Sequence, residues 1–186
     1  MQWKEHFKLK GKHAILSPSQ PCWLKYEPER LVEYATNKAA AERGTELHEW
    51  AAKTIKLGIR QACPRGKTPT LQAYVNDAIA FHMDPEVPLY YSDYCFGTAD
   101  TISFINGKLR IHDLKTGSGR IHPEQLVVYA ALFCLEYREE PERLNLIELR
   151  VYQNDEVMVL DVEPEDVSEA MNVIVAHDKV LRESII

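Results

Sequence analysis

The chain has 186 residues, 45% of them hydrophobic, and a formal net charge of −6. This length suits a single domain over residues 1–186 with its own core, and no apolar run approaches the roughly 18 residues that a membrane span requires. The basic N-terminus lacks the apolar stretch of a signal peptide, so we expect a cytoplasmic protein that does not enter a membrane.

The acidic charge is concentrated in the C-terminal part of the chain. Residues 136–186 carry 14 acidic and 5 basic residues, whereas residues 1–135 carry 14 acidic and 17 basic residues. Local charge, more than net charge, decides which surface attracts phosphate. The overall charge therefore does not exclude a phosphate-binding surface on the first 135 residues.

A short helix is predicted near the N-terminus. Ser17 or Ser19 is suited to the N-cap position, because prolines follow early. Trp23 and Leu24 are predicted to be its buried anchors.

Two longer helices are predicted next. Residues 31–57 are rich in alanine and have apolar positions at helical spacing, although Gly44 is expected to interrupt them. A basic loop follows. Residues 70–83 form the second predicted helix, with Thr68 or Thr70 as its cap.

The pattern then changes to one typical of β-strands. Residues 87–93, 94–107 and 108–117 are rich in β-branched and aromatic side chains. The Asn-Gly pair at 106–107 predicts a tight hairpin between the second and third strands.

The C-terminal part returns to mixed structure. Residues 123–137 are predicted to be a helix, residues 144–162 two strands around a turn at 154–155, and residues from Pro164 to about 182 a last helix. The element order predicts an α/β (α+β) fold with a central mixed sheet of about five strands, flanked by helices.

Two carboxylates are expected to face each other across the predicted hairpin. Asp100 and Asp113 lie at near-opposed positions, and like charges there repel unless a cation or a proton lies between them. Oxygen-rich pairs of this kind suit Mg²⁺ or Mn²⁺. The alternative is a pair of solvated carboxylates at the edge of a sheet.

Lys115 follows Asp113 on the same face of the third strand, because side chains alternate along a strand. There its ammonium could neutralise a phosphate oxygen or orient an attacking water. The alternative is a simple ion pair with Asp113. Because Asp100 is expected close by as well, a catalytic role for Lys115 is better supported than a simple ion pair.

Two helices carry further candidates. Gly44, His48 and Ala52 share one helical face, where two small residues would let a ligand approach the imidazole, although a packed helix histidine is the alternative. Gln125 and Tyr129 share a face of the helix at 123–137. That pair means little by itself.

The four cysteines are isolated in the sequence. Cys22, Cys63, Cys95 and Cys134 form no CxxC pair, so neither a zinc site nor a disulfide framework is indicated. We expect them to be small buried apolar residues.

Taken together, four motifs resemble those of RecB-type nucleases of the PD-(D/E)XK superfamily. The motifs, in the order of that family, are GTxxH (Gly44, Thr45, His48), GxxD (Gly97, Asp100), DLK (Asp113, Leu114, Lys115) and QxxxY (Gln125, Tyr129). The resemblance covers about residues 13–135, and the early LSPSQ is similar to the capped segment that precedes these motifs. Ala99 stands where many relatives have proline.

The resemblance implies a restriction-endonuclease-like core and a metal-dependent DNA nuclease. Cleavage of phosphodiester bonds in DNA processing or recombination is the implied activity, with an exonuclease the favoured form. By the same resemblance, Mg²⁺ or Mn²⁺ would be held by His48, Asp100, Asp113 and the Leu114 carbonyl. Lys115 would activate water and stabilise phosphate charge, and Gln125 and Tyr129 would order the site and the DNA backbone.

Some relatives hold an iron–sulfur cluster with one upstream and three downstream cysteines. Only Cys134 lies downstream here, so no cluster is expected. There is no Walker A motif, and the chain resembles a stand-alone phage-like module, acting in a bacterial or phage-infected cell. The alternative is an inactive nucleic-acid-binding or assembly subunit with the same fold.

DNA is the expected partner, with a homo-oligomer or a recombination protein as further partners. The basic excess of the first 135 residues places the DNA contacts there. The candidate residues are Lys38, Arg43, Arg65, Lys67 and Arg120.

Overall fold

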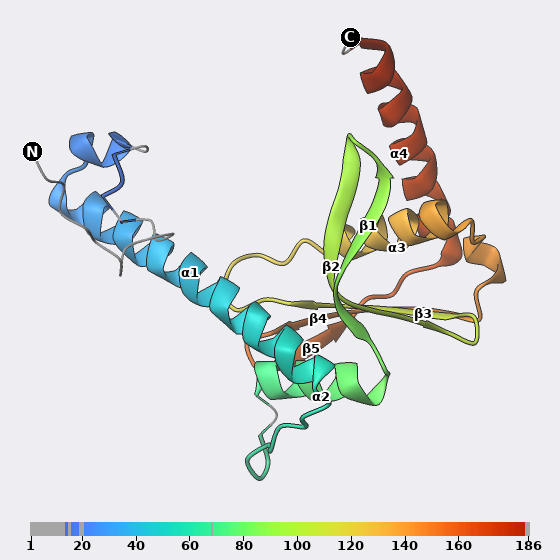
Figure 1. Ribbon diagram of the computed structural model, residues 1–186, viewed down its shortest axis with the longest axis horizontal. Helices are drawn as coiled ribbons and strands as arrows, with labels where there is room; N and C mark the ends of the chain where they lie inside the picture. The colour runs from blue at the N-terminus through green and yellow to red at the C-terminus, as the bar shows by residue number, and fades with distance from the viewer. Residues whose placement is uncertain (1–13, 15, 19–20, 68, 185–186) are drawn as a thin grey trace, which may run out of the picture. The chain divides into compact units, whose positions relative to one another are not determined.

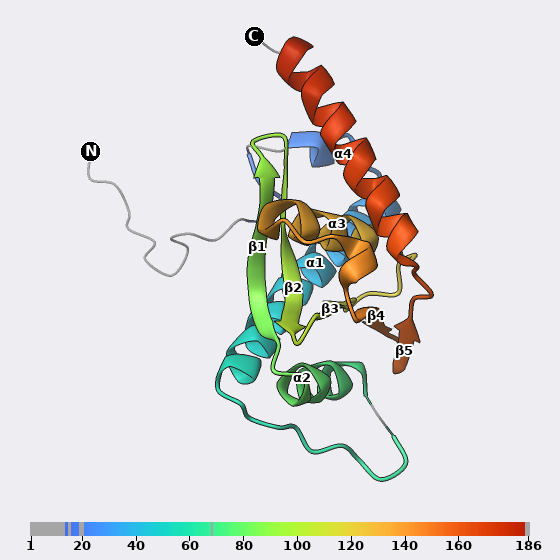
Figure 2. The same ribbon diagram turned by 90° about the vertical axis from the view of Figure 1, so that its right-hand side faces the viewer.

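The computed structural model describes residues 14, 16–18, 21–67 and 69–184, and Figures 1 and 2 show it from two sides. The contacts between residues divide the chain into two units, Met1–Thr45 and Glu46–Ile186. The prediction of a single domain stays a prediction. Among the described residues, no helix has both the length and the apolar character to cross a membrane.

The predicted first helix is a 3₁₀ turn, η2 (Pro21–Lys25). The Trp23 indole N–H donates to the Ser17 carbonyl at 3.0 Å, and the side chain is half-buried. Leu24 is 69% exposed, so its prediction as a buried anchor is wrong. With three residues per turn, adjacent side chains point about 120° apart, so Trp23 and Leu24 cannot share a face. Ser19 lies outside the described residues.

Helix α1 (Pro28–Lys56) runs unbroken through Gly44, so the predicted interruption is wrong. One glycine costs a helix only about 1 kcal/mol, which the alanine-rich sequence around it tolerates. At the C-terminal end of α1, Ala51 and Ile55 are buried in a cluster with residues of α2 (Thr70–Ala80).

The N-cap of α2 is Pro69, and Thr70 is already helical, so the prediction of Thr70 as the cap is wrong. The Thr70 side chain instead bonds Asp155 at the turn between β4 and β5. Its hydroxyl accepts a hydrogen bond from the Asp155 backbone N–H at 2.6 Å, and its own N–H donates to the Asp155 carboxylate at 2.9 Å. Thr68 lies outside the described residues.

A five-stranded mixed sheet forms the centre of the C-terminal unit, in the order β1-β2-β3-β4-β5. Only β3 and β4 are parallel, and α3 (Glu124–Tyr137) connects them; α4 (Pro164–Ser184) ends the chain. The predicted α+β class, with a mixed sheet flanked by helices, is confirmed. The strands are β1 (Asp84–Ser92), β2 (Cys95–Ile105), β3 (Lys108–Leu114), β4 (Leu146–Gln153) and β5 (Glu156–Val159).

The two predicted hairpin turns are both present. Asn106 and Gly107 have φ angles of 53° and 72°, the pair of positive values that a type I′ turn requires. Asn154 and Asp155 do the same between β4 and β5, with φ angles of 53° and 60°. The turn chemistry visible in the sequence thus sets the register of both hairpins.

Helices cover the two faces of the sheet. Leu126, Ala130 and Phe133 of α3 pack in one core with Ile111 of β3 and Leu149 of β4. On the other face, α2 forms a second core with the end of α1 and with β3 and β4. Figures 1 and 2 both show α3 and α2 on opposite sides of β3 and β4.

In the middle of the β1–β2 hairpin, the two strands exchange the faces that they present to α3. Glu86 has a φ angle of 55°, unusual for a residue with a side chain, and it lies between the pairs Pro85↔Thr101 and Val87↔Ala99. Ala99 and Ile102 are three residues apart on β2, yet both face the α3 core. A regular strand would put them on opposite faces. The face that each strand presents to α3 therefore changes at Glu86 and its cross-strand neighbour, Asp100.

The cysteines are only partly buried. Cys134 on α3 is buried and Cys95 is half-buried, but Cys22 and Cys63 are exposed, so the expectation of buried cysteines is wrong for these two. Cys22 lies in the 3₁₀ turn and Cys63 in the loop before α2. Neither segment packs into one of the two buried clusters.

A partly buried polar network ties α2 to the sheet. The Tyr152 hydroxyl donates to Asp77 at 2.8 Å and lies 3.2 Å from His112 Nδ1. Because that hydroxyl already donates to Asp77, the Nδ1 nitrogen carries the proton of a neutral His112. Arg150 bonds both Asp77, at 3.1 Å, and Glu148, at 3.2 Å. Glu148 also accepts from Arg110 at 3.1 Å.

His112 is fully buried, and burial, together with the nearby Arg150 and Arg110, lowers its pKa to about 3. The pKa in the unfolded chain is near 6.5, so the unfolded chain takes up the proton first. The stabilising effect of a neutral His112 is therefore complete above pH 6.5 and is lost as the pH falls toward 3. The loss is about 1.4 kcal/mol per pH unit.

We predict that His112→Gln weakens the dependence of the unfolding free energy on pH between 6.5 and 4.5. Urea unfolding at several pH values measures it, with the exposed His122→Gln as the matched control. If the unfolding free energy of the wild type and of His112→Gln fell equally as the pH was lowered, His112 would not be held neutral in the folded protein.

Candidate functional site

Lys115 is held in place just beyond the end of β3. Its ammonium donates to Asp113 Oδ1 at 3.1 Å and to Gln125 Oε1 at 3.0 Å, and it lies 2.9 Å from Asp113 Oδ2. Its backbone N–H continues the β3–β4 ladder by donating to the Tyr152 carbonyl at 2.9 Å. β3 and the first turn of α3 thus hold the lysine side chain, and β4 holds its backbone.

Asp100 and Asp113 are brought together as the sequence predicts. Thr101 pairs with His112, so Asp100 and Asp113 occupy the next positions along the two strands. Asp100 Oδ2 accepts a hydrogen bond from the Leu114 N–H at 2.9 Å. Asp113 is only 4% exposed, and its burial, followed by the negative charge of Asp100, raises its pKa.

His48 reaches the same carboxylates from α1. Its Nδ1 lies 3.5 Å from Asp100 Oδ1. The hydrogen bond with Asp100 raises the pKa of His48, and the charges of Asp100, Glu86 and Asp113 add to this, while burial opposes it. The imidazole is therefore surrounded by negative charge.

Glu86 joins His48, Asp100 and Asp113 at the site, although the sequence pattern does not predict it. One ligand atom each of His48, Glu86 and Asp100 lie within 4.8 Å of one another. Burial and the charge of Asp100 raise the pKa of Glu86. The predicted strand began at residue 87. Its place opposite Asp100 depends on the register of β1 with β2, which no turn motif in the sequence indicates.

Gln125 and Tyr129 lie on the α3 side of the site. Burial raises the pKa of Tyr129, and the neighbouring Gln125 side chain acts in the opposite direction. Tyr129 packs directly on Gly97 of β2, where an added Cβ would lie 3.0 Å from Tyr129 Cε1. The glycine of the GxxD motif thus makes room for the tyrosine of the QxxxY motif.

These groups line a cleft of about 370 Å³. Its lining consists of His48, Thr98, Asp100, Asp113, Leu114, Lys115, Thr116, Gly117, Gly119, Arg120, Gln125, Tyr129 and Gln153. All of the predicted metal-binding and catalytic residues are among them. Glu86 is not, although its carboxylate is close to His48 and Asp100.

Gln153 is a second residue that sequence reasoning missed. Its side-chain amide donates to the carbonyls of Gly117 and Gly119, at 2.5 and 2.9 Å, and holds the loop after Lys115. No sequence signal identifies this role, because it depends on the parallel pairing of β3 with β4. Arg120, at the end of that loop, faces the same cleft.

The other predicted DNA-binding residues lie outside the lining of this cleft. Arg65 and Lys67 are exposed in the loop between α1 and α2. Arg43 is exposed in the N-terminal unit. Lys38, in the same unit, donates to the Ala14 carbonyl at 2.8 Å and lies 5.9 Å from the centre of the Tyr34 ring.

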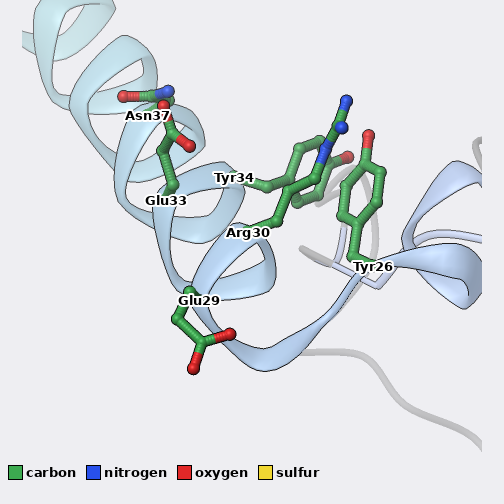
Figure 3. A pocket seen from close by; sticks show the side chains of 6 residues that line it. All are labelled: Tyr26, Glu29, Arg30, Glu33, Tyr34 and Asn37. Carbon is green, nitrogen blue, oxygen red and sulfur yellow. The ribbon is translucent and has the colours of Figure 1, made fainter.

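A second pocket, of about 520 Å³, lies within the N-terminal unit (Figure 3). It is lined by Tyr26, Glu29, Arg30, Glu33, Tyr34 and Asn37. The Arg30 guanidinium lies 4.8 Å from the centre of the Tyr26 ring. This lining offers neither a histidine nor a lysine beside its carboxylates, so the catalytic chemistry is better placed in the 370 Å³ cleft.

Comparison with protein-family models, with curated proteins and with solved structures finds no match to this chain. The resemblance to RecB-type nucleases rests on the four motifs and their order.

The carboxylates and the imidazole predict a divalent-cation site that can be measured without any substrate. We expect Mn²⁺ to bind in titration calorimetry, and His48→Ala, Asp100→Asn and Glu86→Gln each to weaken it by at least about tenfold, because each removes one ligand or one charge. Glu156→Gln changes an exposed acid of β5 and is the matched control. Equal affinity in all four variants would place any Mn²⁺ elsewhere.

Proposed function

We propose that this protein is a divalent-metal-dependent deoxyribonuclease that hydrolyses phosphodiester bonds during DNA processing or recombination, most simply as an exonuclease. One observation carries the proposal. One cleft is lined by His48 of α1, Asp100 of β2, Asp113 of β3 and Lys115 of the loop after β3. Lys115 is hydrogen-bonded to both Asp113 and Gln125. A binding protein needs no such grouping of acids with a fixed lysine.

The charge of the cleft supports a metal cofactor. Burial, followed by the charge of Asp100, raises the pKa of Asp113 and of Glu86, and a bound cation would stabilise the charged form of both carboxylates. Oxygen ligands with one imidazole suit Mg²⁺ or Mn²⁺. We assign His48, Asp100, Asp113 and the Leu114 carbonyl as its ligands, with Glu86 as a further carboxylate. When bound, the ion would lower the pKa of a water molecule and polarise the phosphate.

The other residues of the cleft suit the handling of a phosphodiester. Lys115 presents a fixed positive charge, which stabilises the charge that develops on phosphate during hydrolysis. Gln125 orients that ammonium, and the Tyr129 hydroxyl can donate a hydrogen bond to a phosphate oxygen. The cleft volume falls within the range typical of small-molecule sites.

Arg120 is the DNA-contact candidate nearest to this chemistry, because it lines the cleft itself. The other candidates for DNA contact are Lys38, Arg43, Arg65 and Lys67. We propose that the protein works in the cytoplasm of a bacterial or phage-infected cell. A second copy of the chain or a recombination protein would be its protein partner.

Cleavage assays on linear single-stranded, linear double-stranded and closed circular DNA test the proposal. We expect cleavage with Mn²⁺ or Mg²⁺ and none in excess EDTA, because the carboxylates act only through the cation. Cutting of linear but not circular DNA identifies an exonuclease. Full activity in EDTA, or no cleavage of any of these substrates, would refute the proposal; in the second case an inactive binding or assembly subunit becomes the better explanation.

Two variants separate metal binding from the chemical step. Lys115→Ala keeps all the carboxylates, so we expect Mn²⁺ to bind while single-turnover cleavage falls on the order of a hundredfold. Asp113→Asn removes a ligand charge, so metal affinity and cleavage should fall together. Cleavage by Lys115→Ala at the wild-type rate would remove the lysine from the mechanism.

The DNA surface has its own electrostatic test. Arg120→Ala should weaken DNA binding and reduce the slope of log K against log salt by about 1, because one phosphate contact is lost. Arg143→Ala changes an exposed arginine of the acidic C-terminal part and is the matched control. Unchanged affinity and slope in Arg120→Ala would exclude this arginine from the DNA contacts.

A further inference from the structure

One face of the β1–β2 hairpin is exposed along its outer half. The odd-numbered residues Leu89 and Ala99 are buried in the α3 core, and Val87 and Tyr91 pack against it. Between Glu86 and Tyr90, and between Phe96 and Asp100, the even-numbered residues therefore point away from α3 and are exposed or half-buried. In cross-strand order, starting at the cleft, this outer face consists of Glu86 beside Asp100, Pro88 paired with Thr98, and Tyr90 paired with Phe96.

Two aromatic rings form the far end of this outer face. Phe96 is 67% exposed and Tyr90 is 49% exposed. Their rings stack with 6.4 Å between centroids and an angle of 27° between planes. The Tyr90 hydroxyl donates to Asp93 at 2.9 Å, which limits rotation of its ring. Exposed stacked rings of this kind carry no part of the hydrophobic core.

The hairpin that carries the rings is anchored firmly. Ser92 near its turn bonds the Asp178 carboxylate of α4, and Asp178 also pairs with Arg182 at 2.6 Å. Figures 1 and 2 both show β1 and β2 continuing beyond β3 toward α3 and α4. The hairpin that carries the two rings is therefore tied to α4 close to its turn.

The outer face is continuous with the cleft. Thr98 lines the cleft together with Asp100, and Phe96 is the next residue on the same face of β2. Four residues of a strand span about 13 Å, so the aromatic pair lies within reach of a short segment of any strand that enters the cleft.

The chemistry of the outer face selects bases over phosphates. None of its six residues is basic, and the two nearest the cleft are acidic, so it would repel a sugar–phosphate backbone. The hydrogen bond with Asp93 raises the pKa of Tyr90, and the nearby Arg182 only opposes this, since its guanidinium is paired with Asp178. Exposed aromatic rings stack on unpaired bases, whereas the bases of a duplex are already stacked inside it.

We propose that the outer face of the β1–β2 hairpin binds unpaired bases of single-stranded DNA by stacking on Tyr90 and Phe96, and leads that strand into the carboxylate cleft. This inference rests on the proposed nuclease function and narrows its substrate to single strands or frayed ends. The bases of duplex DNA are not expected to contact Tyr90 and Phe96.

The test measures oligonucleotide binding by fluorescence anisotropy in the Lys115→Ala background, where cleavage is suppressed. Phe96→Leu and Tyr90→Leu keep apolar side chains but remove the π faces, so single-strand affinity should fall on the order of tenfold in each. The slope of log K against log salt should not change, because no phosphate contact is lost. Affinity for blunt duplex should also be unchanged.

Phe104→Leu is the matched control. Phe104 is also four residues from Asp100 on β2, but in the other direction, and it packs on Phe133 with 5.0 Å between centroids. It should leave single-strand affinity unchanged. A 2-aminopurine base placed at successive positions of the oligonucleotide should be quenched at one position, and the quenching should disappear in Phe96→Leu.

Unchanged single-strand affinity in a doubly substituted Tyr90→Leu, Phe96→Leu protein would overturn the inference. If the wild type still cleaved DNA with Mn²⁺, the proposed function would stand without it. If the wild type neither bound nor cleaved DNA, both would fall. An equal loss for single strands and duplex would also overturn the inference, because it would show a general disturbance of the cleft.

Discussion

The reversal of the β1–β2 hairpin at Glu86 is the constraint on which the site depends. On one side of it, β2 presents Ile102 to the α3 core, and on the other side it presents Ala99. Asp100 lies between them, at the point where the strand changes face, and is left half-buried at the cleft. A left-handed conformation at a glutamate costs on the order of 1 kcal/mol or more. The buried contacts on both sides of the reversal offset that cost.

The same reversal concentrates negative charge. It sets the carboxylates of Glu86 and Asp100 beside the imidazole of His48, and the register of β2 with β3 adds the buried Asp113. Lys115 is paired with Asp113 and compensates only part of this charge. The hydrogen bond with Asp100 raises the pKa of His48, while burial, followed by the charge of Asp100, raises the pKa of Glu86 and Asp113. A site of this kind is more easily explained by the ion it could bind than by its contribution to stability.

Much of this arrangement could be predicted, because it depends on local rules. The Asn106–Gly107 turn determines the pairing of β2 with β3, and counting back from it places Asp100 opposite Asp113. Glu86 could not be found in that way, since its position depends on a second hairpin with no diagnostic turn. The role of Gln153 depends on contacts between segments more than 30 residues apart. The continuous path of α1 through Gly44 reflects a balance of small energies that the sequence pattern does not reveal.

The links made by residues 153–155 have a consequence for the order in which the protein matures. Gln153 holds the loop that follows Lys115, and Asp155, two residues later, bonds Thr70 at the start of α2. Both contacts require β4, which is synthesised after every residue that lines the cleft except Gln153 itself. A nascent chain that ends before residue 146 thus carries nearly all the reactive groups without the support that organises them. The cleft can be completed only after residues 146–155 have left the ribosome.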